Sequence, residues 1–205
     1  TRKWYENIGF SYDLNVSNQL NATDSTFFTK KTLKDMRNSV RHTLPISGNF
    51  TLFKYLNFNA GFNYREDWYF SYITKTYYDF FERKNDENGK IDTFYNQAVE
   101  ETKYGFKAYR DFNFNMSFNT QLFGLFQFKN SKFKAIRHTF RPSLNFNFSP
   151  DFTKPFWKYN RTVQTDSIGS VATYSIFFFI VIVPQTKQGN IGVSFSNTLE
   201  IKFYS

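Results

Sequence analysis

The chain has 205 residues with no cysteine and two histidines, which excludes disulfide frameworks and thiolate metal sites and argues against any metal centre. Aromatic residues make up 22% of the chain while its mean hydropathy is −0.55, so much aromatic surface must meet something other than a protein interior. The net charge of +9 falls largely near the ends of the predicted strands, where we expect rim and lipid-headgroup contacts and no nucleic acid.

The first predicted strand, 7–17, places an apolar residue at every second position. Its apolar members are Ile8, Phe10, Tyr12, Leu14 and Val16. Because side chains of a strand point alternately to opposite faces, this segment has one apolar and one polar face along its whole length. Strands of soluble sandwiches have about 5–6 residues, whereas a tilted strand needs about 9–11 to cross a bilayer. The length therefore favours a membrane strand.

Five more segments with the same alternation follow in chain order, at 39–52, 56–73, 104–126, 133–148 and 190–203. The connections between strands alternate between long and short, with long outer loops predicted at 74–103 and 149–189. Outer-membrane barrels have short periplasmic turns and long outer loops. We therefore predict an all-β fold, a transmembrane antiparallel up-and-down β-barrel.

Six strands are fewer than the eight of the smallest single-chain barrels. The chain also starts at Thr1 without a leader and stops directly after an alternating segment. We expect 1–205 to be a partial outer-membrane barrel domain that supplies about six strands of a larger barrel. A soluble β-sandwich shows the same alternation, but the length of these strands argues against it.

The two histidines, His42 and His138, are expected on the apolar face near strand ends, at headgroup level. An outer-membrane phospholipase would pair such a histidine with a serine. None of the outward positions assigned in the first five strands is a serine. The sequence therefore predicts no enzyme and no cofactor.

Two prolines, Pro45 and Pro142, lie inside predicted strands, on positions expected to face inward. Each removes one hydrogen-bond donor from the strand ladder. Two interpretations remain open. Each proline marks a bulge or a strand end, or it weakens a seam so that neighbouring strands can part.

Five segments together resemble the barrel domain of the lipopolysaccharide-assembly outer-membrane protein (LptD-like), in a branch distant from the proteobacterial one. They are MRNSVRHTLPISGNF at 36–50, FNYREDWYF at 62–70, AIRHTFRPSLNFNFSPDFTKP at 135–155, NRTVQTDSIGSV at 160–171 and KQGNIGVSFSNTLEIK at 187–202. The apolar stretch YSIFFFIVIVP at 174–184, which contains the run 176–183, departs from the polar Gly/Asn-containing loop expected there.

The resemblance implies a barrel integral to the bacterial outer membrane. It would take lipopolysaccharide delivered through the periplasm and release it into the outer leaflet through a lateral opening, without bond chemistry. The implied partners are lipopolysaccharide and outer-membrane lipid, a lipoprotein plug inside the lumen and a periplasmic β-jellyroll bridge. The Asn-rich inward face with Arg65, Arg137 and Arg141 suits a phosphorylated sugar head.

Other functions share the same wall. A porin, a TonB-dependent receptor or a secretion pore would show the same strands. A structural or adhesive surface barrel would carry its function in the two long loops.

Overall fold

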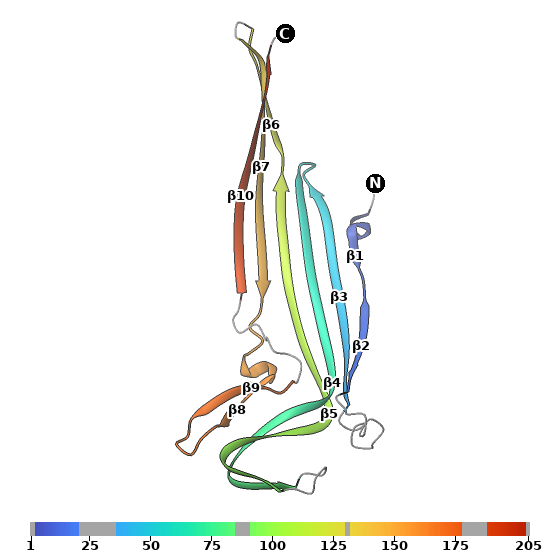
Figure 1. Ribbon diagram of the computed structural model, residues 1–205. Coiled ribbons are helices and arrows are strands. Elements are labelled where there is room, and N and C mark those ends of the chain that lie inside the picture. The colour runs from blue at the N-terminus through green and yellow to red at the C-terminus, as the bar shows by residue number, and fades with distance from the viewer. Residues whose placement is uncertain (1–2, 21–35, 85–90, 130–131, 178–187, 204–205) are drawn as a thin grey trace.

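The computed structural model describes residues 3–20, 36–84, 91–129, 132–177 and 188–203 (Figure 1). Within these residues the regular elements are ten strands and two short 3-10 helices. In chain order they are η1 (Trp4–Asn7), β1 (Ile8–Phe10), β2 (Asp13–Gln19), β3 (Arg37–Leu52), β4 (Leu56–Lys84), β5 (Ile91–Thr120), β6 (Leu122–Gln127), β7 (Phe133–Ser149), η2 (Pro155–Trp157), β8 (Asn160–Gln164), β9 (Val171–Ser175) and β10 (Gln188–Phe203). Among the described residues no helix is long and apolar enough to cross a membrane.

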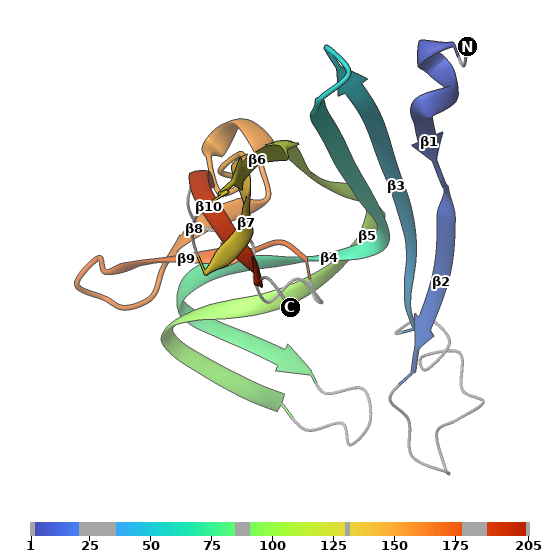
Figure 2. The same cartoon turned by 90° about the horizontal axis from the view of Figure 1, so that it is seen from above.

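The main sheet is antiparallel throughout, with the order β1-β3-β4-β5-β7-β10. β2 continues β1 along β3, and β6 continues β5 along β7. The sheet therefore has six strand positions in sequential up-and-down order, which confirms the predicted all-β fold class. Seen from above, the strands follow a curved path (Figure 2).

In the middle of the wall, the register keeps the large apolar side chains of β3, β4 and β5 on one face of this sheet. Phe58 of β4 lies between Phe50 of β3 and Phe118 of β5, and these three aromatic rings stack across the strands. On the opposite face, Asn59 lies between Asn49 and Ser117 in the same way. Such cross-strand pairs stabilise a sheet by about 0.2–1 kcal/mol each. The wall consequently has an apolar face and a polar face, as the alternation predicts.

Short turns join the strands at one end of the sheet. β3 and β4 are joined by residues 53–55, where Phe53 and Lys54 have positive φ angles of 51° and 69°. Side chains other than glycine adopt this conformation at a cost of roughly 1–2 kcal/mol per residue. The other short connection joins β6 and β7. β2 and β7 end at the opposite end of the sheet, where β4 and β5 also leave it (Figure 1).

The prediction of a long loop at 74–103 is wrong. β4 continues through it to Lys84 and β5 begins at Ile91, with pairs such as Tyr77 opposite Ala98 and Phe81 opposite Phe94. Threonine, tyrosine and phenylalanine favour strands, and they extend the hairpin beyond the apolar wall. Only the tip of this hairpin, 85–90, lies outside the described residues.

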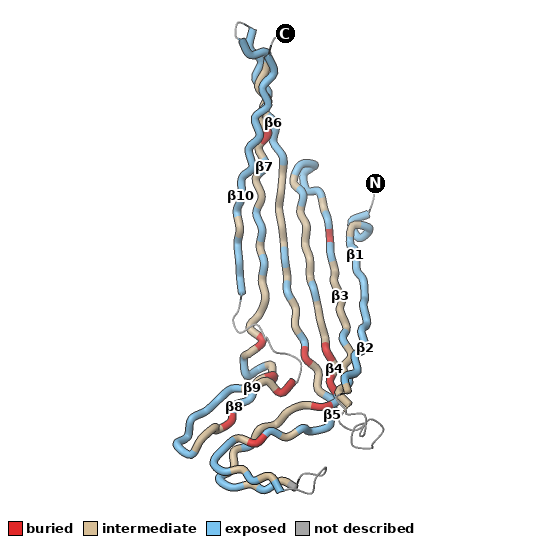
Figure 3. Tube along the Cα trace, viewed as in Figure 1, coloured by how far each residue is buried: buried red, intermediate tan, exposed pale blue. Residues whose placement is uncertain are grey.

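The predicted loop 149–189 also contains structure, the helix η2 and the hairpin β8–β9. Its side chains form most of the buried core, which is concentrated where β4 and β5 leave the wall (Figure 3). The core residues are Tyr69, Tyr109, Phe152, Tyr159, Ile176 and Phe177. The segment 149–177 therefore folds back onto the wall. We call it the outer segment.

Candidate functional site

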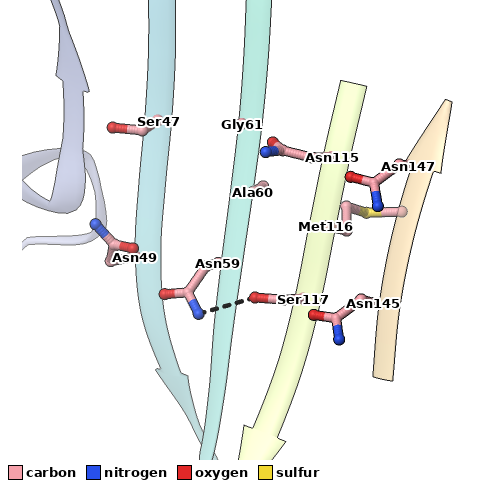
Figure 4. A pocket seen from close by; sticks show the side chains of 10 residues that line it. All are labelled: Ser47, Asn49, Asn59, Ala60, Gly61, Asn115, Met116, Ser117, Asn145 and Asn147. Carbon is pink, nitrogen blue, oxygen red and sulfur yellow. Dashed lines mark hydrogen bonds between the residues drawn. The ribbon is translucent and has the colours of Figure 1, made fainter. Parts of the chain in front are cut away.

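The polar face carries a ladder of amide and hydroxyl side chains across β3, β4, β5 and β7 (Figure 4). Asn59 donates a hydrogen bond to Ser117 Oγ at 3.1 Å, and further along the same strands Asn57 donates to Asn119 at 3.3 Å and Asn63 to Asn113 at 2.8 Å. We call this set the amide ladder. Its members are Ser47, Asn49, Asn57, Asn59, Asn63, Asn113, Asn115, Ser117, Asn119, Asn145 and Asn147.

The ladder lines two hollows in the sheet surface, of about 390 Å³ and about 610 Å³. Gly61 opens the first hollow, because any larger side chain there would collide with Asn115, which lies across it. The second hollow continues from Asn63 to Gln188 and Asn190 of β10. Neutral groups that both donate and accept hydrogen bonds thus line the polar face from β3 to β10.

A belt of ion pairs lies at one end of the amide ladder, the end opposite the short turns. Arg41 binds both carboxylate oxygens of Asp67, at 2.7 and 3.0 Å, and Asp67 is only 1% exposed. Arg65 pairs with Asp111 and stacks over the Tyr109 ring with its guanidinium carbon 5.5 Å from the centroid. Charge-assisted contacts of this kind, and above all the bidentate pair of Arg41 and Asp67, are among the strongest hydrogen bonds in proteins. Arg65, predicted to contact a sugar phosphate, is therefore already engaged within the wall.

The three arginines predicted as site residues do not come together. Arg137 and Arg141 both lie on the polar face of β7, on either side of Thr139 and toward the short turns, whereas Arg65 lies at the other end of the amide ladder. The Arg137 guanidinium lies 3.5 Å from the Glu200 carboxylate and 5.0 Å from the centre of the Phe123 ring. Arg141 lies opposite Ser196 of β10. Their contribution to substrate binding remains a prediction.

Pro45 lies beside the break between β1 and β2. Ser11 N–H donates to the Pro45 carbonyl oxygen at 3.2 Å, so the missing proline N–H faces the same neighbour, since both groups of one residue point to one side in an antiparallel ladder. β1 ends at Phe10 and β2 begins at Asp13. The proline therefore interrupts the seam between the first strand position and β3.

Pro142 likewise lies beside a break in a neighbouring strand, the one between β5 and β6. The β7–β10 register runs through it without a shift, whereas on the other side β5 ends at Thr120 and β6 begins at Leu122. Its expected inward orientation is wrong. Pro142 pairs with Phe195 and has the parity of Phe140 and Leu144, so it belongs to the apolar face.

Polar side chains border the apolar face at the level of the ion-pair belt. Glu66 accepts hydrogen bonds from Tyr64 at 2.6 Å, Trp68 at 2.9 Å and Arg110 at 3.0 Å. His42 contacts the Tyr12 hydroxyl at 2.6 Å, and its ring centre lies 4.1 Å from that of Trp68. Aromatic and charged side chains of this kind are typical of the interfacial girdle of membrane barrels.

The outer segment is held on the wall by main-chain and aromatic contacts. Ile73 N–H donates to the Ile176 carbonyl at 2.8 Å, and Ile176 N–H donates to the Tyr159 carbonyl at 3.0 Å. The Tyr159 hydroxyl both donates to and accepts from the Arg110 backbone, at 2.9 Å each. The first two residues of the apolar run 176–183 are thus buried in the core, and the rest lie outside the described residues.

Two carboxylates of the outer segment are stabilised in their ionised form by local hydrogen bonds. The Thr153 hydroxyl and backbone N–H hold the pKa of Asp151 below its ordinary value. Hydrogen bonds from Ser170 do the same for the pKa of Asp166 in the β8–β9 turn. Burial raises the pKa of Tyr159, which stays a neutral donor.

An antiparallel wall with one apolar and one amide-lined face is typical of the wall of a transmembrane β-barrel. A family model described as LptD protein matches residues 1–205. The chain therefore belongs to the LptD family of outer-membrane proteins, which act in lipopolysaccharide transport and not as enzymes. Comparison with curated proteins found no match, and neither did comparison with solved structures.

Proposed function

We propose that this protein forms part of an outer-membrane translocon that inserts lipopolysaccharide into the outer leaflet without making or breaking bonds. The amide ladder is the observation that carries the proposal. Sugar hydroxyls need partners that both donate and accept hydrogen bonds, and asparagine and serine supply them. Family membership supports this function over that of a porin, a TonB-dependent receptor, a secretion pore or an adhesive barrel.

The ladder is suited to passage and not to tight binding. On the polar face, the described positions Asn57–Asn63 of β4, Asn113–Asn119 of β5 and Ser143–Ser149 of β7 carry no charge. Neutral hydrogen bonds contribute only about 0.5–1.5 kcal/mol each, so a glycan can exchange one set for the next along the strands. The glycan would move toward the long connections, which face outward in barrels of this class.

The break beside Pro45 supports a lateral exit for the lipid part. The first strand position, β1 with β2, is joined to β3 by two short stretches of pairing. A donor missing from the ladder lowers the free energy needed to separate these strands. In this proposal a lipoprotein plug and a periplasmic bridge complete the machine, and this chain contributes the wall.

The proposal is tested by depleting the protein in cells and measuring surface lipopolysaccharide. We expect surface lipopolysaccharide to fall as the protein is lost. A photoreactive amino acid at Asn115, inside the hollow, should crosslink to lipopolysaccharide. Normal surface levels after depletion would refute the proposed function.

A further inference from the structure

The polar face changes character where β6, β7 and β10 extend beyond the β3–β4 turn (Figure 1). Phe123 and Leu125 of β6 take the place of amide side chains there, and they are 59% and 61% exposed. The register places Phe123 opposite Thr139 and Leu125 opposite Arg137. Both side chains therefore point to the same face as the polar side chains of β5 and β7. Two large apolar side chains therefore lie on the polar face.

Cations surround these two apolar side chains. Arg137 stacks on Phe123 and lies near Glu200, as described above, while Arg141 and Lys202 share the same face. The described part of the chain gives no ion pair to Arg141 or to Lys202. Three cations therefore accompany one carboxylate around an apolar surface. We call Phe123, Leu125, Arg137, Arg141 and Lys202 the amphipathic patch.

We propose that the amphipathic patch binds the lipid end of an anionic amphiphile, with an acyl chain against Phe123 and Leu125. Its phosphate groups would lie at the two ends of the patch, one beside Arg141, which is opposite Ser196, and one beside Lys202, which is opposite Ala135. The inference rests on the proposed function and adds which end of lipopolysaccharide this part of the wall contacts. A neutral glycan would need amides, as in the ladder. Apolar side chains combined with unpaired cations are instead complementary to acyl chains and phosphate.

The patch and the ladder are continuous along β7. Arg141 is two residues from Ser143, which begins the uncharged part of the strand, so one molecule lying along β7 touches both surfaces. Its lipid end then points toward the short turns and its glycan toward the long connections. The Arg137 guanidinium lies between the levels of Arg141 and Lys202 along the strands and is already ordered by stacking on Phe123. It therefore adds positive charge for a phosphate at a low entropy cost.

Photocrosslinking in the full-length protein in cells tests the inference. A photoreactive residue at Leu125 reports on the patch, one at Asn145 on the ladder, and one at Leu199 on the opposite face of the same extension. We expect Leu125 to label lipopolysaccharide even when its glycan is truncated to the inner sugars, while labelling at Asn145 falls with truncation. Replacing Arg141 and Lys202 together by glutamine should weaken labelling at Leu125 by about tenfold.

The outcomes separate this inference from the proposed function. Lipopolysaccharide labelling at Asn145 without labelling at Leu125 overturns the inference and leaves the proposed function standing. No labelling at either position overturns the inference and the proposed function together. Crosslinks from Leu125 to polypeptide alone would make the patch a protein-docking surface and overturn the inference. Labelling at Leu125 no stronger than at Leu199 would indicate ambient lipid and also overturn it.

Discussion

Replacing Phe177 by alanine should release the outer segment from the wall. Phe177 is 3% exposed, and its ring centre lies 5.0 Å from that of Tyr69, 5.8 Å from Tyr109 and 5.7 Å from Tyr159. Truncating a buried phenylalanine to alanine costs about 3–5 kcal/mol, through lost transfer free energy and the cavity left behind. Because 1.4 kcal/mol corresponds to about tenfold, the opening equilibrium should shift by at least about a hundredfold.

Amide hydrogen exchange measures this opening directly. The Ile73 and Ile176 N–H groups are bonded to the outer segment, so both should exchange at least about a hundredfold faster in Phe177→Ala. Phe156→Ala is the matched control, since Phe156 lies in the same segment but is 82% exposed. Amides of the β4–β5 ladder near Phe58 should not change in either variant. Equal exchange at Ile73 in the two variants would refute the assignment of Phe177 as the anchor.

Three further predictions concern the belt, the turn and the hairpin. Asp67→Asn should lower the free energy of unfolding by about 1–3 kcal/mol, less than for a fully buried pair because its partner Arg41 is half-exposed. The temperature at which half of the protein loses its folded mobility on a gel, the heat-modifiability midpoint, should fall in this variant and stay unchanged in the exposed Asp13→Asn. Lys54→Gly should raise that midpoint by relieving about 1 kcal/mol of left-handed strain, and a lower midpoint would contradict the turn geometry. The pKa of Asp166 is depressed in the folded protein. The stability that Asp166 gives the β8–β9 hairpin is therefore complete above the unfolded pKa and lost as the pH falls through the folded pKa. Proteolysis of this hairpin should consequently rise on acidification. In Asp166→Asn, proteolysis should already be high at neutral pH, and an unchanged acid dependence would count against the hydrogen bonds from Ser170.

Local patterning predicted the wall because each strand position repeats the same alternation. The tight turn after Leu52 also predicts the register between β3 and β4, which the alternation alone does not. Counting back from the pair Leu52 and Leu56 places Arg41 directly opposite Asp67, so turn position and register together predict this ion pair. The partner of Arg65 was not accessible in this way, since the long β4–β5 hairpin shifts register between Tyr69 and Ser71.

The core at the outer segment could not be predicted from local pattern. Tyr109 and Tyr159 are distant in sequence, and neither lies in a segment whose periodicity specifies the contact. Their rings are 4.8 Å apart only because the chain between them returns from β7 to the β4–β5 hairpin. The amphipathic patch was missed for a different reason. Phe123 and Leu125 stand at polar positions of the alternation, and alternation alone gives no reason for apolar residues there.

The two faces of the wall place the membrane boundary at the same level. On the apolar face of β3, uninterrupted apolar positions extend from Leu44 to Leu52, and His42 with Glu66 opposite begins the polar border. Nine strand residues span about 30 Å and, at the usual tilt, about 23 Å of bilayer, close to the roughly 25 Å apolar band of such barrels. On the polar face the belt of Arg41 and Asp67 lies at this same border. Charge is therefore absent from both faces of β3 between this level and the turn, so the outer segment packs on the wall beyond the hydrocarbon, where its polar groups can meet water.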